Sequence, residues 1–134
     1  MARFATLIEL YRNQEEEVRR ELGRRERRRF ELLAERERLC AERLAAALTV
    51  DPAMHEQYLA WWQTIDATIA EIERDLKVIE QALIEVRAEL IAAHRRTTTI
   101  AKLRELDDAR AEHAAERRRQ RANDEFATRP RAVS

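Results

Sequence analysis

The sequence predicts an all-α fold, in which two long helices form an antiparallel coiled-coil hairpin and the second helix is the longer. The chain of 134 residues has one glycine, two prolines and 39% charged residues, a composition typical of long helices. A seven-residue apolar repeat runs through the second half of the chain, and one turn signal divides the chain into two helices. We expect a single hairpin domain at 1–127, with helices at about 3–48 and about 52–127, a turn at 49–52 and a flexible tail at 128–134.

The repeat lies between Tyr58 and Ile100, where apolar residues recur at alternating steps of four and three. Two apolar positions in seven describe the seam of a coiled coil, because a globular helix normally carries a wider apolar stripe. The predicted seam consists of Tyr58, Trp62, Ile65, Ile69, Ile72, Leu76, Ile79, Leu83, Val86, Leu90, Ala93, Thr97 and Ile100. This seam needs a partner helix along its whole length, and the first helix is the candidate.

The apolar stripe of the first helix is less regular. It is predicted to consist of Phe4, Ile8, Tyr11, Val18, Leu22, Phe30, Leu33, Cys40, Leu44 and Leu48, with Glu15, Glu26 and Glu37 interrupting it. The phase slips between Leu22 and Phe30, which we expect to change the supercoil locally without ending the helix. Cys40 is expected to be a small buried residue, and the arginine run at 24–29 to form a solvated face.

The turn signal is Asp51-Pro52. Asp51 suits the N-cap of a helix, and Pro52 suits its first position, where the missing N–H costs nothing. So short a connection favours an antiparallel arrangement. Because the next proline is Pro130, the second helix is expected to continue about thirty residues beyond the start of the first. This overhang carries Arg110, Arg117, Arg118, Arg119 and Arg121, mixed with acidic residues and alanines. These arginines are either disordered solvating charge or a docking face for acidic loops of a partner.

Charge and motifs argue against several classes of function. The 26 basic residues balance the 26 acidic ones, so no net field draws the chain to nucleic acid or to an anionic membrane. No apolar run is long enough to span a bilayer, and the first residues do not resemble a signal peptide, so we expect a cytoplasmic location. The three histidines lack metal-ligand spacing, and one glycine cannot form a phosphate-binding loop. We therefore expect no enzymatic activity, no metal and no cofactor.

Two adjacent tryptophans lie close to the turn. Neighbouring residues point about 100° apart on a helix, so only Trp62 can lie centrally on the seam. Trp61 is then either an exposed contact for a partner or a lid folded over the end of the hairpin. The sequence leaves both interpretations open.

Both ends of the chain, together with the single hairpin, resemble a known family. The opening Arg3-Phe4-Ala5-Thr6-Leu7-Ile8-Glu9-Leu10-Tyr11-Arg12 and the later stretches Lys102-Leu103-Arg104-Glu105 and Asp124-Glu125-Phe126-Ala127 are similar to those of the FliJ family of flagellar type III export. Related stalk proteins of injectisomes share this architecture. The resemblance covers essentially the whole chain. It implies a non-enzymatic stalk, similar to the γ subunit of rotary ATPases, that lies peripheral to the membrane-bound export apparatus.

Such a stalk is expected to bind and stimulate the hexameric export ATPase, to link it to the membrane export gate and to escort export chaperones. The resemblance implies ATPase contacts at Arg3, Phe4, Tyr11, Lys102, Arg104, Arg110, Arg117, Arg118 and Arg121. It implies contacts with a gate-side partner at the tip residues Tyr58, Trp61 and Trp62. We expect the free chain to be a monomer.

Two alternatives remain. The chain could be a generic structural scaffold that forms homo-oligomers, such as a four-helix bundle of two hairpins. Binding of nucleic acid through the arginine runs is the least favoured, because the net charge is zero.

Overall fold

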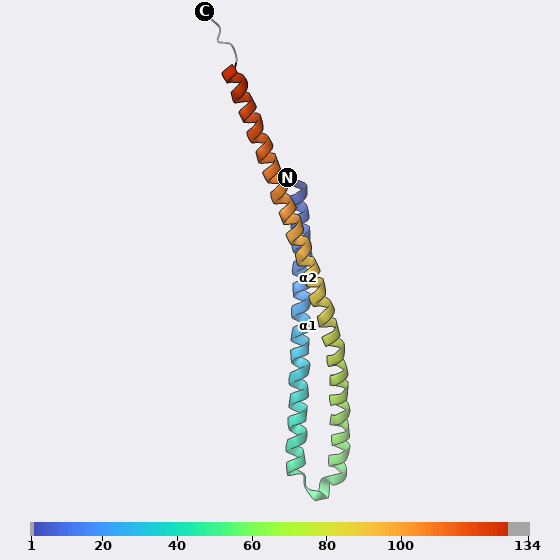
Figure 1. Cartoon of the computed structure of the whole chain (residues 1–134). Helices are drawn as coiled ribbons and strands as arrows, with labels where there is room; N and C mark the ends of the chain where they lie inside the picture. Colours follow the sequence, from blue (N-terminus) through green and yellow to red (C-terminus); the bar gives the residue numbers. More distant parts are fainter. Residues whose placement is uncertain (1, 129–134) are drawn as a thin grey trace, which may run out of the picture. The chain divides into compact units, whose positions relative to one another are not determined.

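The computed structural model describes the backbone of residues 2–128 and the side chains of residues 4–128. Within them the fold is the predicted all-α hairpin, and no strand occurs in this part of the chain. Helix α1 spans Ala2–Thr49, a short 3-10 turn η1 spans Pro52–Met54, and helix α2 spans His55–Thr128 (Figure 1). With 74 residues against 48, α2 is the longer helix, as predicted. The predicted tail beyond Thr128 lies outside the described residues.

Asp51 caps the start of the second arm, as its position before Pro52 predicts. Its side-chain Oδ1 accepts a hydrogen bond from the backbone N–H of Ala53 at 3.0 Å, and its carbonyl oxygen accepts one from Met54 N at 2.8 Å. Pro52 occupies a position where no N–H is needed. The first turn is wound as a 3-10 helix, so the α-helix proper begins only at His55.

The hairpin consists of two compact units. The turn unit comprises residues 16–92, and the terminal unit comprises residues 1–15 and 93–134. Each contains part of both helices. In the turn unit α2 buries Ile69, Ile72, Leu76, Leu83 and Val86. In the terminal unit it buries Ala93 and Thr97 and half-buries Ile100. The seam predicted for the second helix is therefore confirmed.

The seam of α1 differs from the prediction. From Leu22 the steps of three and four continue without a slip, through positions that are all buried or half-buried: Arg25, Arg29, Leu32, Arg36, Leu39, Arg43 and Ala46. Phe30, Leu44 and Leu48, which the prediction placed on the seam, are 73%, 64% and 79% exposed. The prediction of a phase slip was wrong, because arginines take seam positions that apolar residues were expected to take.

Arginine fits a seam position because its long aliphatic stem covers apolar neighbours while its guanidinium reaches the edge of the helix pair. Arg25 and Arg29 are accordingly half-buried, so the predicted solvated face at 24–29 is only partly solvated. Glu26 and Glu37 are exposed and do not interrupt the seam, whereas Glu15 occupies it and is 4% exposed. Cys40 is half-buried against the core, close to the expectation.

Candidate functional site

A second apolar stripe runs along α1 in the turn unit, beside the seam. This outer stripe consists of Phe30, Leu33, Cys40 and Leu44, again at steps of three and four once Glu37 is included. Leu33 and Cys40 pack against the buried core cluster, whereas Phe30 and Leu44 are mostly exposed. A helix with two apolar stripes normally lies between two partners, and α2 covers only the seam. The outer stripe is therefore a candidate contact surface for another helix.

Charged pairs join α1 to α2 along the edge of the seam in the turn unit. Arg43 Nη1 lies 2.9 Å from Asp66 Oδ1, Arg29 Nε lies 3.4 Å from Glu80 Oε1, and Arg87 Nη2 lies 3.6 Å from Glu26 Oε1. The first two start from seam arginines of α1 and end on acidic residues of α2. These pairs align the two helices, although such half-exposed ion pairs each contribute about 1 kcal/mol or less to stability.

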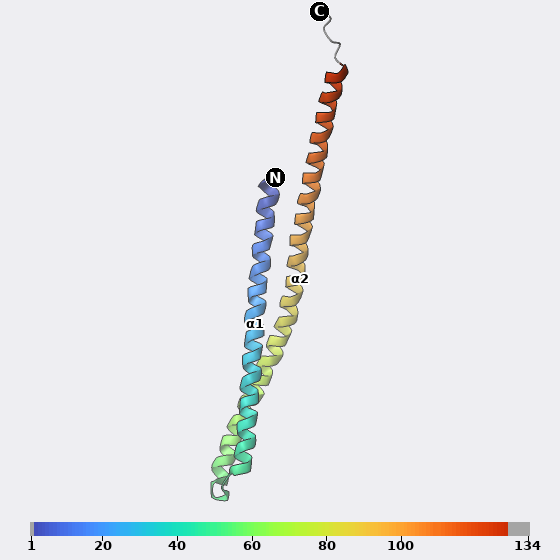
Figure 2. The ribbon, with the colours of Figure 1, turned by 90° about the vertical axis from the view of Figure 1, so that its left-hand side faces the viewer.

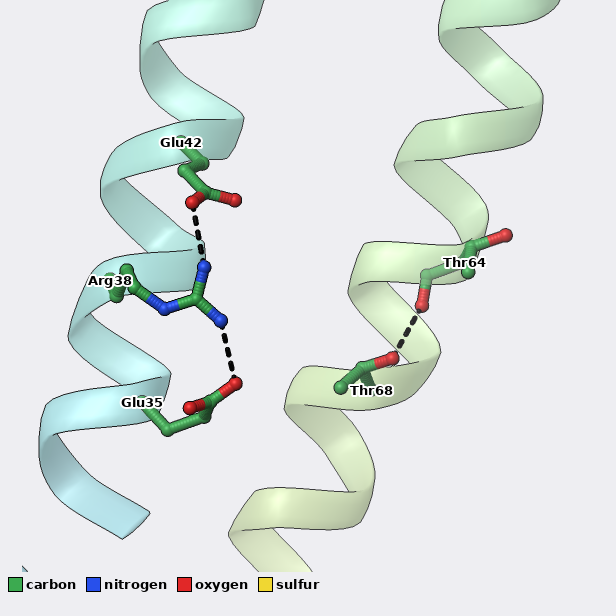
Figure 3. A network of polar contacts seen from close by, with 5 residues as sticks. All are labelled: Glu35, Arg38, Glu42, Thr64 and Thr68. Atoms are coloured by element: carbon green, nitrogen blue, oxygen red, sulfur yellow. Dashed lines mark hydrogen bonds and ion pairs between the residues drawn. The ribbon is translucent and has the colours of Figure 1, made fainter. Parts of the chain in front are cut away.

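Other charged groups of the turn unit pair within one helix. Arg38 donates to Glu35 and to Glu42 at 2.7 Å each (Figure 3), and these hydrogen bonds, that of Glu35 first, raise the pKa of Arg38. In the same figure the hydroxyl of Thr68 donates to the carbonyl oxygen of Thr64 at 3.0 Å. Both interactions support the helices locally.

The three candidate tip residues are half-buried, and of them Tyr58 and Trp61 come together. The rings of Tyr58 and Trp61 lie 6.1 Å apart between centroids. Trp61 also lines a shallow hollow of about 300 Å³ at the end of the hairpin, together with Ala46, Thr49, Val50, Met54, Gln57 and Tyr58. On the seam, Trp62 lies under the guanidinium of Arg43, 5.4 Å from ring centroid to carbon, a cation–π contact. Of the two interpretations of Trp61, this geometry favours the lid.

In the terminal unit α2 continues past the first residue of α1 (Figure 2). Of the candidate ATPase contacts, Phe4 and Tyr11 are half-buried, and Arg104 is half-buried with its Nε 3.8 Å from Asp108 Oδ2. The exposed candidates are Lys102, Arg110, Arg117, Arg118 and Arg121. The side chain of Arg3 lies outside the described part. The candidates are thus spread along α2 and do not form one cluster.

Tyr11 nevertheless meets α2 at a groove that the sequence did not indicate. The groove has a volume of about 300 Å³ and is lined by Tyr11, Arg95, Arg96, Thr99, Ile100 and Leu103. Arg95 and Arg96 have no ion pair or hydrogen bond with another described residue. One sequence signal could have indicated this groove. Thr99, Leu103 and Leu106 follow one another at steps of four and three, on the flank of the seam rather than on it.

Glu15, Thr97 and Asp107 place polar groups in the interior of the terminal unit, and the hydroxyl of Thr97 donates to the carbonyl oxygen of Ala93 at 3.1 Å. Glu15 Oε1 lies 2.6 Å from His94 Nδ1. Oδ2 of Asp107 is buried and has no hydrogen-bond partner among the described residues. Buried polar atoms are normally paired, so this oxygen is costly to bury.

Among the described residues no three His, Cys, Asp or Glu side chains converge as ligands of a metal ion would. Neither helix, over the same residues, holds a stretch long and apolar enough to cross a bilayer.

Comparison with known proteins identifies the family. The model of the family described as "Flagellar FliJ protein" matches residues 1–132, nearly the whole chain. No curated protein and no solved structure matches the chain. The match agrees with the sequence resemblance and with the two unequal antiparallel helices. The chain therefore belongs to the FliJ family, whose role is that of a stalk protein in flagellar export.

Proposed function

We propose that this chain is a non-enzymatic stalk that binds the hexameric flagellar export ATPase, stimulates it, links it to the membrane export gate and escorts export chaperones. The observation that carries the proposal is family membership over residues 1–132 together with the unequal lengths of the two helices. Because α2 extends alone beyond α1, a single helix can enter the opening of a ring more deeply than a pair. Such a role places the chain in the cytoplasm, peripheral to the export apparatus.

The ATPase end in this proposal is the terminal unit. It carries Phe4 and Tyr11 on α1, and Lys102, Arg104, Arg110, Arg117, Arg118 and Arg121 on α2, with Arg3 at the start of the chain. Exposed arginines on a rigid helix suit acidic loops that face the inside of a ring, because guanidinium groups bind carboxylates in forked pairs.

Hydrolysis by the cognate ATPase, measured with and without the chain, tests this role. We expect a several-fold increase and co-migration of the chain with the hexamer in gel filtration. A chain that neither stimulates nor co-migrates is not a stalk.

The gate-side contact in this proposal lies in the turn unit, at the tip residues Tyr58, Trp61 and Trp62 or on the neighbouring outer stripe. A partner contact and a lid differ in what Trp61→Ala changes. If Trp61 contacts the gate, the variant loses affinity for the cytoplasmic part of the gate protein and keeps its melting temperature. If Trp61 is a lid, the melting temperature of the variant falls. Its affinity for the gate protein, measured well below that melting temperature, is then unchanged.

The outer stripe also supports a second candidate, a scaffold that forms homo-oligomers. Two copies could bury Phe30, Leu33 and Leu44 against each other in a four-helix bundle. Light scattering separates the two candidates, because a stalk is expected to be a monomer at micromolar concentration and the scaffold a tight dimer.

A further inference from the structure

The part of α2 that lies in the terminal unit carries unlike charges on its two sides. One stripe, at steps of three and four, is formed by Arg96, Thr99, Leu103, Leu106, Arg110, His113, Arg117 and Gln120, and has no acidic residue. About 160° around the helix, a second stripe carries Glu105, Asp108 and Glu112. The zero net charge of the chain therefore hides a local separation of charge, with Asp107 between the two stripes and Arg119 on the acidic side.

The two stripes differ in how far their charges are already paired. On the acidic side, Asp108 lies near Arg104, and Glu112 accepts a hydrogen bond from Arg119 at 3.3 Å. On the basic side, Arg96, Arg110 and Arg117 have no ion pair or hydrogen bond with any described residue. Their donors are thus available to a ligand.

The basic stripe is also the apolar one. Leu103 and Leu106 are 47% and 49% exposed, and Leu10 of α1 is 48% exposed. Next to Leu103 lies the groove that Tyr11 lines, which has Arg95 and Arg96 in its wall and no carboxylate. An apolar hollow with unpaired guanidinium groups around it is complementary to an apolar side chain flanked by carboxylates.

We propose that this docking face, formed by Tyr11, Arg96, Thr99, Leu103, Leu106 and Arg110, binds a helix of a partner protein that presents apolar side chains at steps of three and four, flanked by Asp or Glu. Steps of three and four match because the face itself has them. Only the identification of that helix with the export ATPase rests on the proposed function; the chemistry of the face does not.

A pair of synthetic helices tests the chemistry with the full chain. One carries a leucine stripe flanked by glutamates, and its twin carries lysines at the same positions. We expect the glutamate helix to bind at least about tenfold more tightly, with the largest NMR shifts at the amides of Thr99 and Leu103, and its affinity to fall with added salt. Equal binding of the two helices, or shifts elsewhere, would overturn the proposal.

The matched variants reverse charge on either side of the same helix. In the double variant Arg96→Glu and Arg110→Glu, whose sites are exposed, the preference should invert toward the lysine helix. The control Arg119→Glu makes one such reversal on the acidic side, and should keep the preference for glutamate. A preference that survives in the double variant contradicts the docking face. The docking face is also contradicted if duplex DNA competes with the glutamate helix and shifts the same amides. It is contradicted as well if the wild-type chain self-associates and the double variant does not.

The ATPase provides the second arm. If the double variant alone loses affinity for the hexamer, the docking face is where the ATPase binds. If the peptides behave as expected but the wild-type chain does not bind the hexamer, the face stands and the stalk function falls. If the wild type binds the hexamer and the peptides show no preference, the function stands and the face falls.

Discussion

Glu15 Oε1 and His94 Nδ1 lie 2.6 Å apart, at a seam position of α1 that would ordinarily hold an apolar side chain. The same relationship recurs in the turn unit, where Arg29 pairs with Glu80 and Arg43 with Asp66. From each pair to the next, the residue number rises by fourteen on α1 and falls by fourteen on α2. Every second heptad thus places a charged seam residue of α1 opposite a complementary residue of α2, which fixes the register of the helices.

The pair formed by Arg29 and Glu80 predicts a charge-swap effect. We expect Arg29→Glu to lower the free energy of unfolding by about 1 kcal/mol, because it replaces an ion pair, with Nε and Oε1 3.4 Å apart in the wild type, by two like charges. Adding Glu80→Arg should recover at least half of the loss in a double-mutant cycle followed by urea unfolding. Arg27→Glu, on the exposed side of α1, provides the control and should have little effect. A double variant as unstable as the sum of the two single variants would show that the pair sets no register.

Two neighbouring residues of α2 are expected to differ strongly in how much their truncation lowers stability. Leu83 is 2% exposed, so Leu83→Ala leaves a cavity and should cost about 3 kcal/mol. Ile84 is 59% exposed, so Ile84→Ala should change stability by about 0.5 kcal/mol or less. Thermal unfolding followed by circular dichroism measures both. Equal effects would mean that the seam does not run through Leu83.

Gly23 predicts a stabilising substitution. It is exposed within α1, and a Cβ added there would meet no atom within 4 Å. Gly23→Ala should therefore raise the free energy of unfolding by about 1 kcal/mol, since glycine is the poorer helix former. The reverse change at an exposed alanine, Ala34→Gly, should lower it by a similar amount. No gain from Gly23→Ala would indicate that this part of α1 bends or frays.

The outer stripe predicts a separation of stability from association. Phe30→Ser and Leu44→Ser remove apolar side chains that are mostly exposed, so the melting temperature should stay within a few degrees of the wild type. If the stripe contacts the gate protein, the variant with both substitutions should lose binding to the gate protein fragment. If the stripe contacts a second copy of the chain, the variant should sediment as a monomer. A large fall in melting temperature would instead assign the stripe to the core.

Glu21 predicts a pH dependence. Hydrogen bonds from Arg24 first and Arg25 second lower the pKa of its carboxyl group. A carboxyl group with a lowered pKa stabilises the fold above its ordinary pKa of about 4.3, and this contribution disappears as the pH falls through the folded-state value. The melting temperature of Glu21→Gln should therefore lie below that of the wild type at pH 7, and the gap should close in acid. Glu17→Gln, whose residue has no ion pair with a described group, should show no such gap.

The sequence was sufficient for α2 and insufficient for α1, for a physical reason. In α2 every predicted seam position from Tyr58 to Ile100 is buried or half-buried, since period and hydrophobicity agree there. In α1 period and hydrophobicity conflict after Leu22. The period places Arg25 and Arg29 on the seam, whereas hydrophobicity places Phe30 there. Extending the period would have given the correct seam, because arginine tolerates a seam position and an exposed phenylalanine is not excluded.

The contact residues were harder to predict. Tyr11 was proposed from the family resemblance, but its groove depends on Arg95 and Thr99, eighty-four and more residues away in the sequence. Trp61 left two interpretations because its direction relative to α1 depends on how tightly the turn at Pro52 closes. Periodicity identifies a stripe on one helix but not what the other helix places beside it.

The arginines on the seam of α1 also decide which coiled coils this helix cannot form. If two copies of α1 zipped together in parallel and in register, Arg29, Arg36 and Arg43 would each face its own duplicate across the interface. Like charges stacked in three successive heptads oppose that assembly, whereas in the hairpin Glu80 and Asp66 of α2 pair with two of them, Arg29 and Arg43. The arginines on the seam of α1 thus select against a parallel pair of first helices and in favour of the antiparallel hairpin.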